Sequence, residues 1–91
     1  MSILSKSYGI SVLKALKHGE KSFMDIVRSI KGDKSTIYRR LREFAELGIV
    51  LERYDHKERC LKYSLTNTGK AILDAVELFE EHTKDLEVAI T

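Results

Sequence analysis

The sequence contains no proline and only one cysteine, Cys60, among its 91 residues. A single cysteine cannot form an intramolecular disulfide, which excludes a disulfide-stabilised scaffold and fits a reducing cytoplasm. No run approaches the roughly 18 consecutive apolar residues that a membrane-spanning helix needs. Charged side chains recur throughout residues 1–20, a pattern that is not typical of a signal peptide. We therefore expect a cytoplasmic protein that has no membrane partner.

The residue patterns of common active sites are absent from the sequence as well. It holds no glycine-rich phosphate loop and no G-x-S-x-G or H-E-x-x-H motif, and none of its three histidines has an evident nucleophile. His56 and Cys60 are four residues apart, but two ligands do not make a metal site. The sequence therefore predicts no enzyme, no metal and no cofactor. Cys60 is interpreted as an inert thiol, with redox sensing through an intermolecular disulfide as the alternative.

Composition and charge indicate one globular unit with two unlike parts. Apolar residues make up 43% of the chain and charged residues 33%, without repeats or a Gly/Ser-rich linker. Residues 1–66 hold 14 Lys/Arg against 8 Asp/Glu, a balance of +6, whereas residues 67–91 hold 2 against 6, a balance of −4. The first part is suited to approach a polyanion, and the second is not.

The segment from Asp33 to Leu47 predicts a helix with two chemically different faces. Asp33 can cap the first turn, and Gly48 can supply the positive φ with which many helices end. At helical spacing, the side expected to be buried consists of Ile37, Leu41, Phe44 and Ala45. The first turn and the opposite side carry Lys34, Ser35, Thr36, Tyr38, Arg39 and Arg42. Such a helix fits the major groove of DNA; the alternative is an ordinary amphipathic helix with a hydrated polar face.

Two shorter helices are predicted before this one. Apolar residues at helical spacing cover residues 5–18, and Gly19 ends the pattern. Ser22, with Asp25 three residues later, resembles a capping box at the start of a short second helix. A glycine-containing turn at residues 31–32 then leads into the third helix, in the proportions of a helix-turn-helix. We expect the first helix to lie across the other two and close a three-helix core.

After the third helix the pattern changes to strands. Residues 49–54 are β-prone, and residues 60–65 alternate with period two. In the second strand, the positions expected to face the core are Leu61, Tyr63 and Leu65. Residues 55–58 form a charged turn of hairpin length, around which positive charge gathers at Arg53, His56, Lys57 and Arg59. A basic hairpin after a recognition-type helix is a wing; the alternative is a plain surface hairpin with solvated charges.

Residues 67–89, capped by Thr66, predict a last helix that is about 35 Å long. Six of its positions step by three and four residues, as in a heptad repeat: Ile72, Val76, Phe79, Thr83, Leu86 and Ile90. A three-helix core is too small to cover this stripe along its whole length. We interpret it as a dimerisation seam with a second copy across a two-fold axis. The alternative is a helix folded back over its own domain.

These segments together resemble the winged helix-turn-helix transcription regulators of the MarR, HxlR and PadR type, with HxlR-like proteins closest. The stretch STIYRRLREFAELGIVLERY is similar to their recognition helix and first wing strand. LKYSLTNTGKAIL resembles their second wing strand and the turn into the C-terminal helix, and GEKSFMDIVRSIKG the first helix of the helix-turn-helix. The resemblance spans roughly residues 8–75. It implies a mainly α fold with a small β-hairpin wing (α+β), and a homodimer bound to a palindromic operator.

The resemblance also implies roles for individual residues. By position, the major groove would be faced by Ser35, Thr36, Tyr38, Arg39 and Arg42, and backbone or minor groove by Arg53, Lys57 and Arg59. Arg39 and Arg42 are the strongest candidates for base contact, because a guanidinium can bond bidentately to guanine. Lys34 and its neighbours at the helix start favour phosphate. Tyr38 is expected either to touch DNA or to pack on the second helix, and Arg40 to reach phosphate or a neighbouring carboxylate.

The sequence thus predicts a sequence-specific, double-stranded-DNA-binding transcriptional regulator, with residues 1–66 as its DNA-binding domain and residues 67–91 as its dimerisation helix. One alternative is a weakly selective architectural protein of the nucleoid. A second, of another class, is a winged-helix adaptor that binds proteins. No inducer is indicated by the residues.

Overall fold

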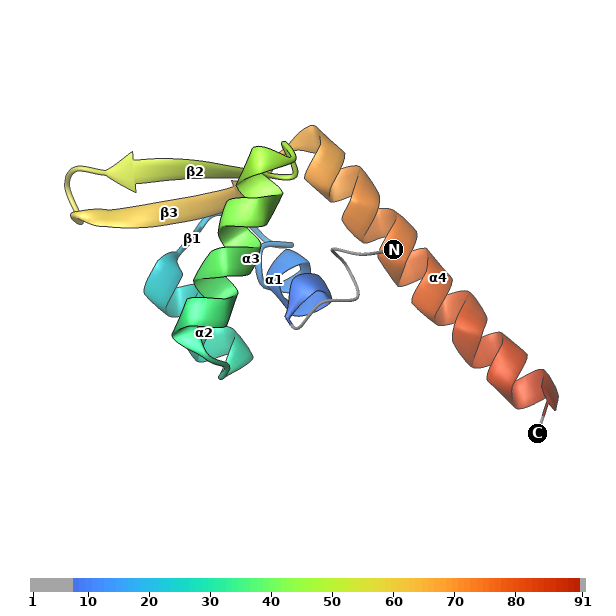
Figure 1. Cartoon of the computed structure of the whole chain (residues 1–91). Coiled ribbons are helices and arrows are strands. Elements are labelled where there is room, and N and C mark those ends of the chain that lie inside the picture. The colour runs from blue at the N-terminus through green and yellow to red at the C-terminus, as the bar shows by residue number, and fades with distance from the viewer. Residues whose placement is uncertain (1–7, 91) are drawn as a thin grey trace.

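The computed structural model describes residues 8–90, and the surroundings of the side chains of residues 8–81. In chain order its elements are α1 (Gly9–Ala15), β1 (Lys21–Ser22), α2 (Phe23–Ile30), α3 (Lys34–Glu46), β2 (Val50–Asp55), β3 (Cys60–Leu65) and α4 (Asn67–Ile90). Figure 1 shows the first three helices gathered beside a small sheet, with the β2–β3 hairpin projecting on one side and α4 on the other. This is the predicted winged helix, an α+β fold in which helices dominate.

Both ends of α3 form as the sequence predicts. The Asp33 carboxylate accepts a hydrogen bond from the Thr36 N–H at 2.8 Å, which satisfies a donor of the first turn. At the other end Gly48 has a φ of 74°. Its N–H donates to the Ala45 carbonyl, and the next N–H donates to the Phe44 carbonyl at 2.9 Å. This pair of bonds is a Schellman motif, which turns the chain sharply into β2.

The two shorter helices differ in how well they match the prediction. The Ser22 hydroxyl accepts a bond from the Asp25 N–H at 3.2 Å and begins α2, as expected. The first helix was expected over residues 5–18, but α1 ends at Ala15 and residues 5–7 lie outside the described residues. After Ala15 the N–H groups donate to carbonyls three residues back, which tightens the chain out of α geometry before Gly19.

The sheet has one strand more than the predicted hairpin. Its order is β1-β3-β2, and both pairings are antiparallel. In β1, Lys21 pairs with Tyr63 and Ser22 with Lys62. Two residues are too few to produce an alternating pattern, so this strand has no signal in the sequence. By joining β3 to the start of α2, β1 fixes the hairpin to the helix-turn-helix.

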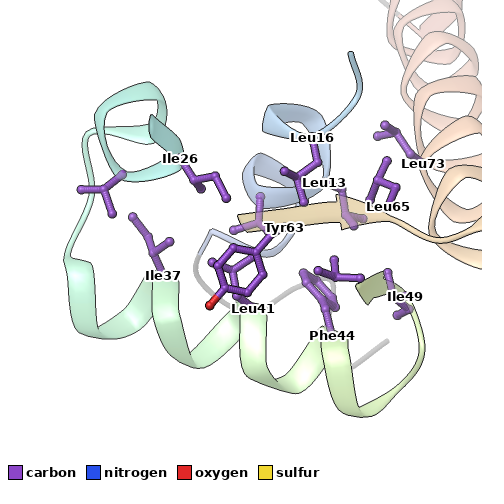
Figure 2. Close-up of a cluster of buried hydrophobic side chains, with 13 residues drawn as sticks. Leu13, Leu16, Ile26, Ile37, Leu41, Phe44, Ile49, Tyr63, Leu65 and Leu73 are labelled. Carbon is purple, nitrogen blue, oxygen red and sulfur yellow. The ribbon is translucent and has the colours of Figure 1, made fainter. Parts of the chain in front are cut away.

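One hydrophobic core holds the helices to the sheet, and Figure 2 shows its side chains converging from α1, α2, α3, β3 and α4. The buried faces of α3 and β3 are the predicted ones: Ile37, Leu41, Phe44 and Tyr63 are fully buried, and Leu65 nearly so. Arg40 is also buried and pairs with Glu43, so its predicted carboxylate contact is the one observed. The remaining buried members are Val12, Leu13, Leu16, Ile26, Val27, Ile49, Val50 and Leu73.

A compact joint connects α3, β2 and α4. The Thr66 hydroxyl donates to the Gly48 carbonyl at 2.6 Å and lies 3.0 Å from the Ile49 carbonyl, while its oxygen accepts the Gly69 N–H at 3.0 Å. The Thr66 N–H also donates to the Ile49 carbonyl at 3.1 Å. Gly69 is buried against this carbonyl. Thr66 therefore caps α4, as predicted, and ties its start to the end of α3.

Candidate nucleic-acid interface

The face of α3 opposite the core carries the side chains that the sequence singled out. Lys34, Ser35, Tyr38 and Arg39 are exposed, and Arg42 is partly exposed. Thr36 differs from them, because its hydroxyl donates to the Asp33 carboxylate at 2.8 Å as part of the N-cap. These bonds from Thr36 hold the pKa of Asp33 below its usual range. The polar face is thus available for contact except at Thr36, which serves the cap.

The two arginines on this face have different surroundings. Arg42 donates to Glu52 at 2.8 Å, and this hydrogen bond raises the pKa of its guanidinium. Within residues 8–81, no carboxylate lies within ion-pair distance of Arg39. Arg42 is therefore held in one direction by a strand of the wing, whereas Arg39 can turn toward a ligand.

Tyr38 packs on the neighbouring helix while remaining partly exposed. Its ring meets that of Phe23 edge-to-face, with centroids 5.9 Å apart and planes at 88°. The phenol is 43% exposed, so its outer edge stays accessible. Of the two roles expected for Tyr38, packing on the second helix is observed, and the accessible edge leaves contact with DNA open as a proposal.

The turn of the wing is organised by one carboxylate. Asp55 accepts the N–H groups of Lys57 and Glu58 at 2.9 and 3.0 Å, and these bonds, led by that from Glu58, lower its pKa. Arg59 follows with a φ of 54°, and β3 begins at the next residue. The His56 ring packs on Tyr54, with centroids 4.9 Å apart. A hydrogen-bonded Asx turn thus replaces the Asn-Gly signal that this hairpin lacks.

The basic residues of the wing fall into two groups. Arg53 donates to both carboxylate oxygens of Glu20, at 2.8 and 3.0 Å, which raises the pKa of Arg53 and lowers that of Glu20. In the part of the chain whose side chains are described, His56, Lys57 and Arg59 have no ion pair. The turn of the wing therefore carries the accessible cations Lys57 and Arg59, whereas Arg53 and Lys62 on the strands are neutralised by carboxylates.

An open groove of about 630 Å³ lies between the start of α2, the first half of α3 and the wing, where Glu58 is one of its lining residues. Its apolar lining comes from Phe23, Met24, Tyr38 and Leu61, with Lys34 among the polar residues at its edge. Cys60 also lines this groove and is partly buried. The recognition face and the wing are thus two walls of one concave surface.

The predicted seam of α4 is divided between two surroundings. Ile72 packs against the domain's own core, and Val76 is half-buried. Phe79 is 71% exposed and its neighbour Leu78 56% exposed. The side chains of Thr83, Leu86 and Ile90 lie outside those that the structure describes. The first turns of α4 therefore contact the core of their own domain, and the more exposed apolar side chains lie further along. The dimerisation seam from Ile72 to Ile90 stays a prediction.

Two ion pairs join the middle of α4 to α1 and to the turn that follows α1. Lys14 lies 3.0 Å from Glu80, and Lys17 lies 2.9 Å from Glu77. The two partners of each pair are 66 and 60 residues apart in the sequence, so no local pattern indicates the pairing. Among the described residues, no helix is long and apolar enough to cross a bilayer, and no group of three His, Cys, Asp or Glu side chains is arranged to hold a metal ion.

Comparison with known proteins identifies the family of this chain. Residues 4–81 match the family described as "Methanogenesis regulatory protein FilR1, N-terminal domain". The chain belongs to that family. It is also 33% identical to the uncharacterised protein MJ0944 of Methanocaldococcus jannaschii, over 93% of this chain and 76% of the relative. This member of the FilR1 N-terminal family is therefore related to a regulatory protein over most of its length.

Comparison with solved structures shows which proteins share the fold of this FilR1-type domain. A protein of Enterococcus faecalis assigned to the MarR family superposes with a TM-score of 0.87, at 22% identity over 97% of this chain and 82% of that one. A PadR-family regulator of Clostridium difficile gives 0.84, at 18% identity and 92% and 98% coverage. A Thermoplasma volcanium protein assigned to the HxlR family gives 0.78, at 24% identity and 93% and 78% coverage. The fold is that of winged-helix transcription regulators, as the resemblance implied.

Sequence reasoning missed the acidic residues of this surface. Glu20 and Glu52 each neutralise an arginine that had been expected to face DNA, and they lie 33 and 10 residues away from it in the sequence. Strand register pairs Glu52 with Tyr63 and not with Arg42, so it offers no signal for the contact with α3. The pairing of Glu20 with Arg53 depends on β1, and β1 has no signal in the sequence.

Proposed function

We propose that the protein is a transcriptional regulator that binds double-stranded DNA sequence-specifically as a homodimer. The observation that carries this proposal is the concave surface formed by α3 and the wing. One side of α3 is fully buried in the core, and the other offers Arg39, Tyr38 and Ser35 to a ligand. The wing adds the unneutralised cations of its tip. Membership of a regulatory-protein family supports the same function. A protein with this function would act in the cytoplasm, on the DNA of the nucleoid.

The shape of the surface supports a specific docking. A helix such as α3 enters the major groove and reads base edges, while its start contacts phosphates through hydroxyls and N–H groups. Lys34 and Ser35 are placed for those phosphates, and Arg39 for a guanine. Lys57 and Arg59 on the wing would then lie on the backbone or the adjacent minor groove. Because these contacts displace counterions, binding should weaken steeply with salt.

In vitro selection from a random duplex library tests the proposal directly. The expected result is a consensus with two-fold symmetry, whose half-sites lie about one helical turn apart and which binds much more tightly than random DNA. Tight binding without a consensus would instead identify an architectural DNA-binding protein. No binding at low salt would leave the protein-binding adaptor.

Arg39→Ala is expected to remove discrimination at one base pair by about 1–3 kcal/mol, because a bidentate contact to that base is lost. Competition binding on single-base variants of the selected site measures this. Arg59→Ala is the matched comparison on the wing, and it should weaken all sequences equally and reduce the salt dependence by about one counterion. If Arg39→Ala also weakens every sequence equally, Arg39 is a phosphate ligand and the assignment of base readout is wrong.

The proposed dimer rests on the exposed apolar side chains of α4. Ala71, Ala75 and Leu78 are exposed at spacings of four and three residues, next to the half-buried stripe that faces the domain. Such a stripe suits packing against the same helix of a second copy. Figure 1 shows α4 continuing well past the rest of the domain, so a second copy can approach it.

Leu78→Lys is expected to weaken the dimer at least tenfold, because it would bring an unpaired charge into an apolar contact. Sedimentation velocity over a concentration series measures the change. Leu51→Lys is the matched control, since Leu51 is similarly exposed, at 58%, on β2. A dimer of unchanged strength in Leu78→Lys would place the interface elsewhere.

A further inference from the structure

A buried phenol, a carboxylate and an arginine form a continuous chain from the core to the recognition face. Tyr63 lies on β3 with none of its surface exposed, and Figure 2 shows its ring against α3 beside Leu41. Its hydroxyl donates to Glu52 Oε2 at 2.9 Å. Glu52 Oε1 accepts the bond from Arg42 Nη1 at 2.8 Å. One carboxylate oxygen of Glu52 thus contacts Tyr63, and the other contacts Arg42.

Strand register explains why Glu52 occupies this place. Glu52 is directly opposite Tyr63 in the β2–β3 pairing, and residues opposite one another project from the same face of a sheet. That face lies against α3. The side chain of Glu52 is only 23% exposed, whereas that of Arg42 is 43% exposed. Glu52 is therefore anchored by the core, and Arg42 is the outer end of the chain.

Burial, followed by the bond to Glu52, raises the pKa of Tyr63, so its hydroxyl stays protonated and continues to donate at neutral pH. The acceptor is then a carboxylate with a fixed orientation, and Arg42 donates to it through a charge-assisted bond. An arginine in solution samples many rotamers, and ordering it on binding costs free energy. Arg42 has lost much of this freedom before any ligand arrives.

The negative charge of Glu52 is costly at a DNA-binding surface. It offsets the charge of Arg42 and repels phosphates, so it lowers affinity for every sequence. A restrained guanidinium, however, keeps its remaining N–H groups aimed in one direction, whereas a free one could turn to the nearest phosphate. A residue that serves specificity is expected to lower the affinity for every sequence while it directs one contact to a particular base.

We propose that Glu52 is a specificity-determining positioning residue, which Tyr63 anchors from the core and which holds Arg42 toward the base edges of the major groove. This rests on the proposed DNA-binding function and assigns a task within it. Glu52 itself makes no contact with the base. It prevents Arg42 from acting as a phosphate ligand.

Glu52→Gln tests the assignment, because it removes the charge at nearly constant volume. Affinities are measured for the selected site and for a scrambled duplex of equal length over a salt series. We expect Glu52→Gln to bind the scrambled duplex several-fold more tightly, with a salt dependence larger by about one counterion. The ratio of the two affinities should fall about tenfold. Tyr63→Phe removes only the anchoring hydroxyl and should lower the ratio in the same direction by a smaller factor.

Glu20→Gln is the matched control, since Glu20 neutralises Arg53 in the wing by the same kind of ion pair. It should raise affinity for both duplexes and leave their ratio unchanged. In the background of Arg42→Ala, Glu52→Gln should no longer change the ratio. Thermal unfolding of each variant verifies that it is folded at the temperature of the assay.

The outcomes separate this inference from the function on which it rests. A wild-type protein that discriminates between the duplexes, together with an unchanged ratio in Glu52→Gln, would overturn the role of Glu52 alone. Unchanged affinities for both duplexes in that variant would remove Arg42 from the interface and overturn it too. A wild-type protein that binds no duplex selectively would overturn the proposed function and the role of Glu52 with it.

Discussion

Gly69→Ala is expected to destabilise the fold by about 1–3 kcal/mol, the range typical of overpacking. A Cβ at this position would lie 2.1 Å from the Ile49 carbonyl oxygen, which is backbone and is bonded to Thr66. Either the first turn of α4 or the start of β2 must move to admit it. Equilibrium unfolding in urea measures the loss.

The destabilisation expected for Gly69→Ala is opposite in sign to the usual effect of Gly→Ala inside a helix. Gly→Ala inside a helix ordinarily stabilises, by about 0.5–1 kcal/mol, because the unfolded chain has less freedom to lose. Gly48→Ala is a useful comparison, since Gly48 has nothing within 4 Å of its hypothetical Cβ and only its φ of 74° resists the change. It should cost less than Gly69→Ala. A Gly69→Ala protein that is as stable as the wild type would show that α4 is not held in this contact.

Phe44→Ala is expected to cost about 3–5 kcal/mol, the range for removing a fully buried phenylalanine. Phe44 has no exposed surface and lies where α3 meets the rest of the core (Figure 2). A domain of this size has a total stability of about 5–14 kcal/mol, so the variant should lose between about a fifth and all of it. Urea unfolding monitored by far-ultraviolet circular dichroism measures the change.

Leu47→Ala is the matched control for Phe44→Ala. Leu47 lies at the end of the same helix but is 59% exposed, so its truncation should change stability by less than about 0.5 kcal/mol. Loss of Phe44 should also abolish DNA binding, because α3 would no longer be supported by the core. If Phe44→Ala folds with wild-type stability, the core must have closed over the space, and the packing described for α3 would be wrong.

Features whose cause is local could be predicted from the sequence. Asp33 and Ser22 cap helices through bonds that reach only three residues ahead, and Gly48 ends α3 through its own φ. The alternation in β3 correctly identified Tyr63 and Leu65 as buried. These signals were enough to establish the winged helix and the polar face of α3.

Features that depend on distant partners could not be predicted. Arg53 was expected to contact DNA from the wing, and its ion pair with Glu20, which β1 brings within reach, was not expected. Likewise, Lys14 and Lys17 are fixed by acidic residues of α4. Periodicity places a residue on a face, but the charge it meets there depends on the register of elements that are remote in the sequence. The neutralisation of two of the predicted cations, Arg42 and Arg53, was not foreseen.

The joint at Thr66 has a mechanical consequence for the proposed dimer. Thr66 bonds the carbonyls that follow the end of α3, and it also caps α4, so we expect the two helices to move together. If α4 pairs with its copy, any change in the angle at which the two copies cross becomes a displacement of both recognition helices along the duplex. Operators with one base pair inserted between the half-sites should therefore be strongly disfavoured, because the joint offers no hinge to absorb the difference.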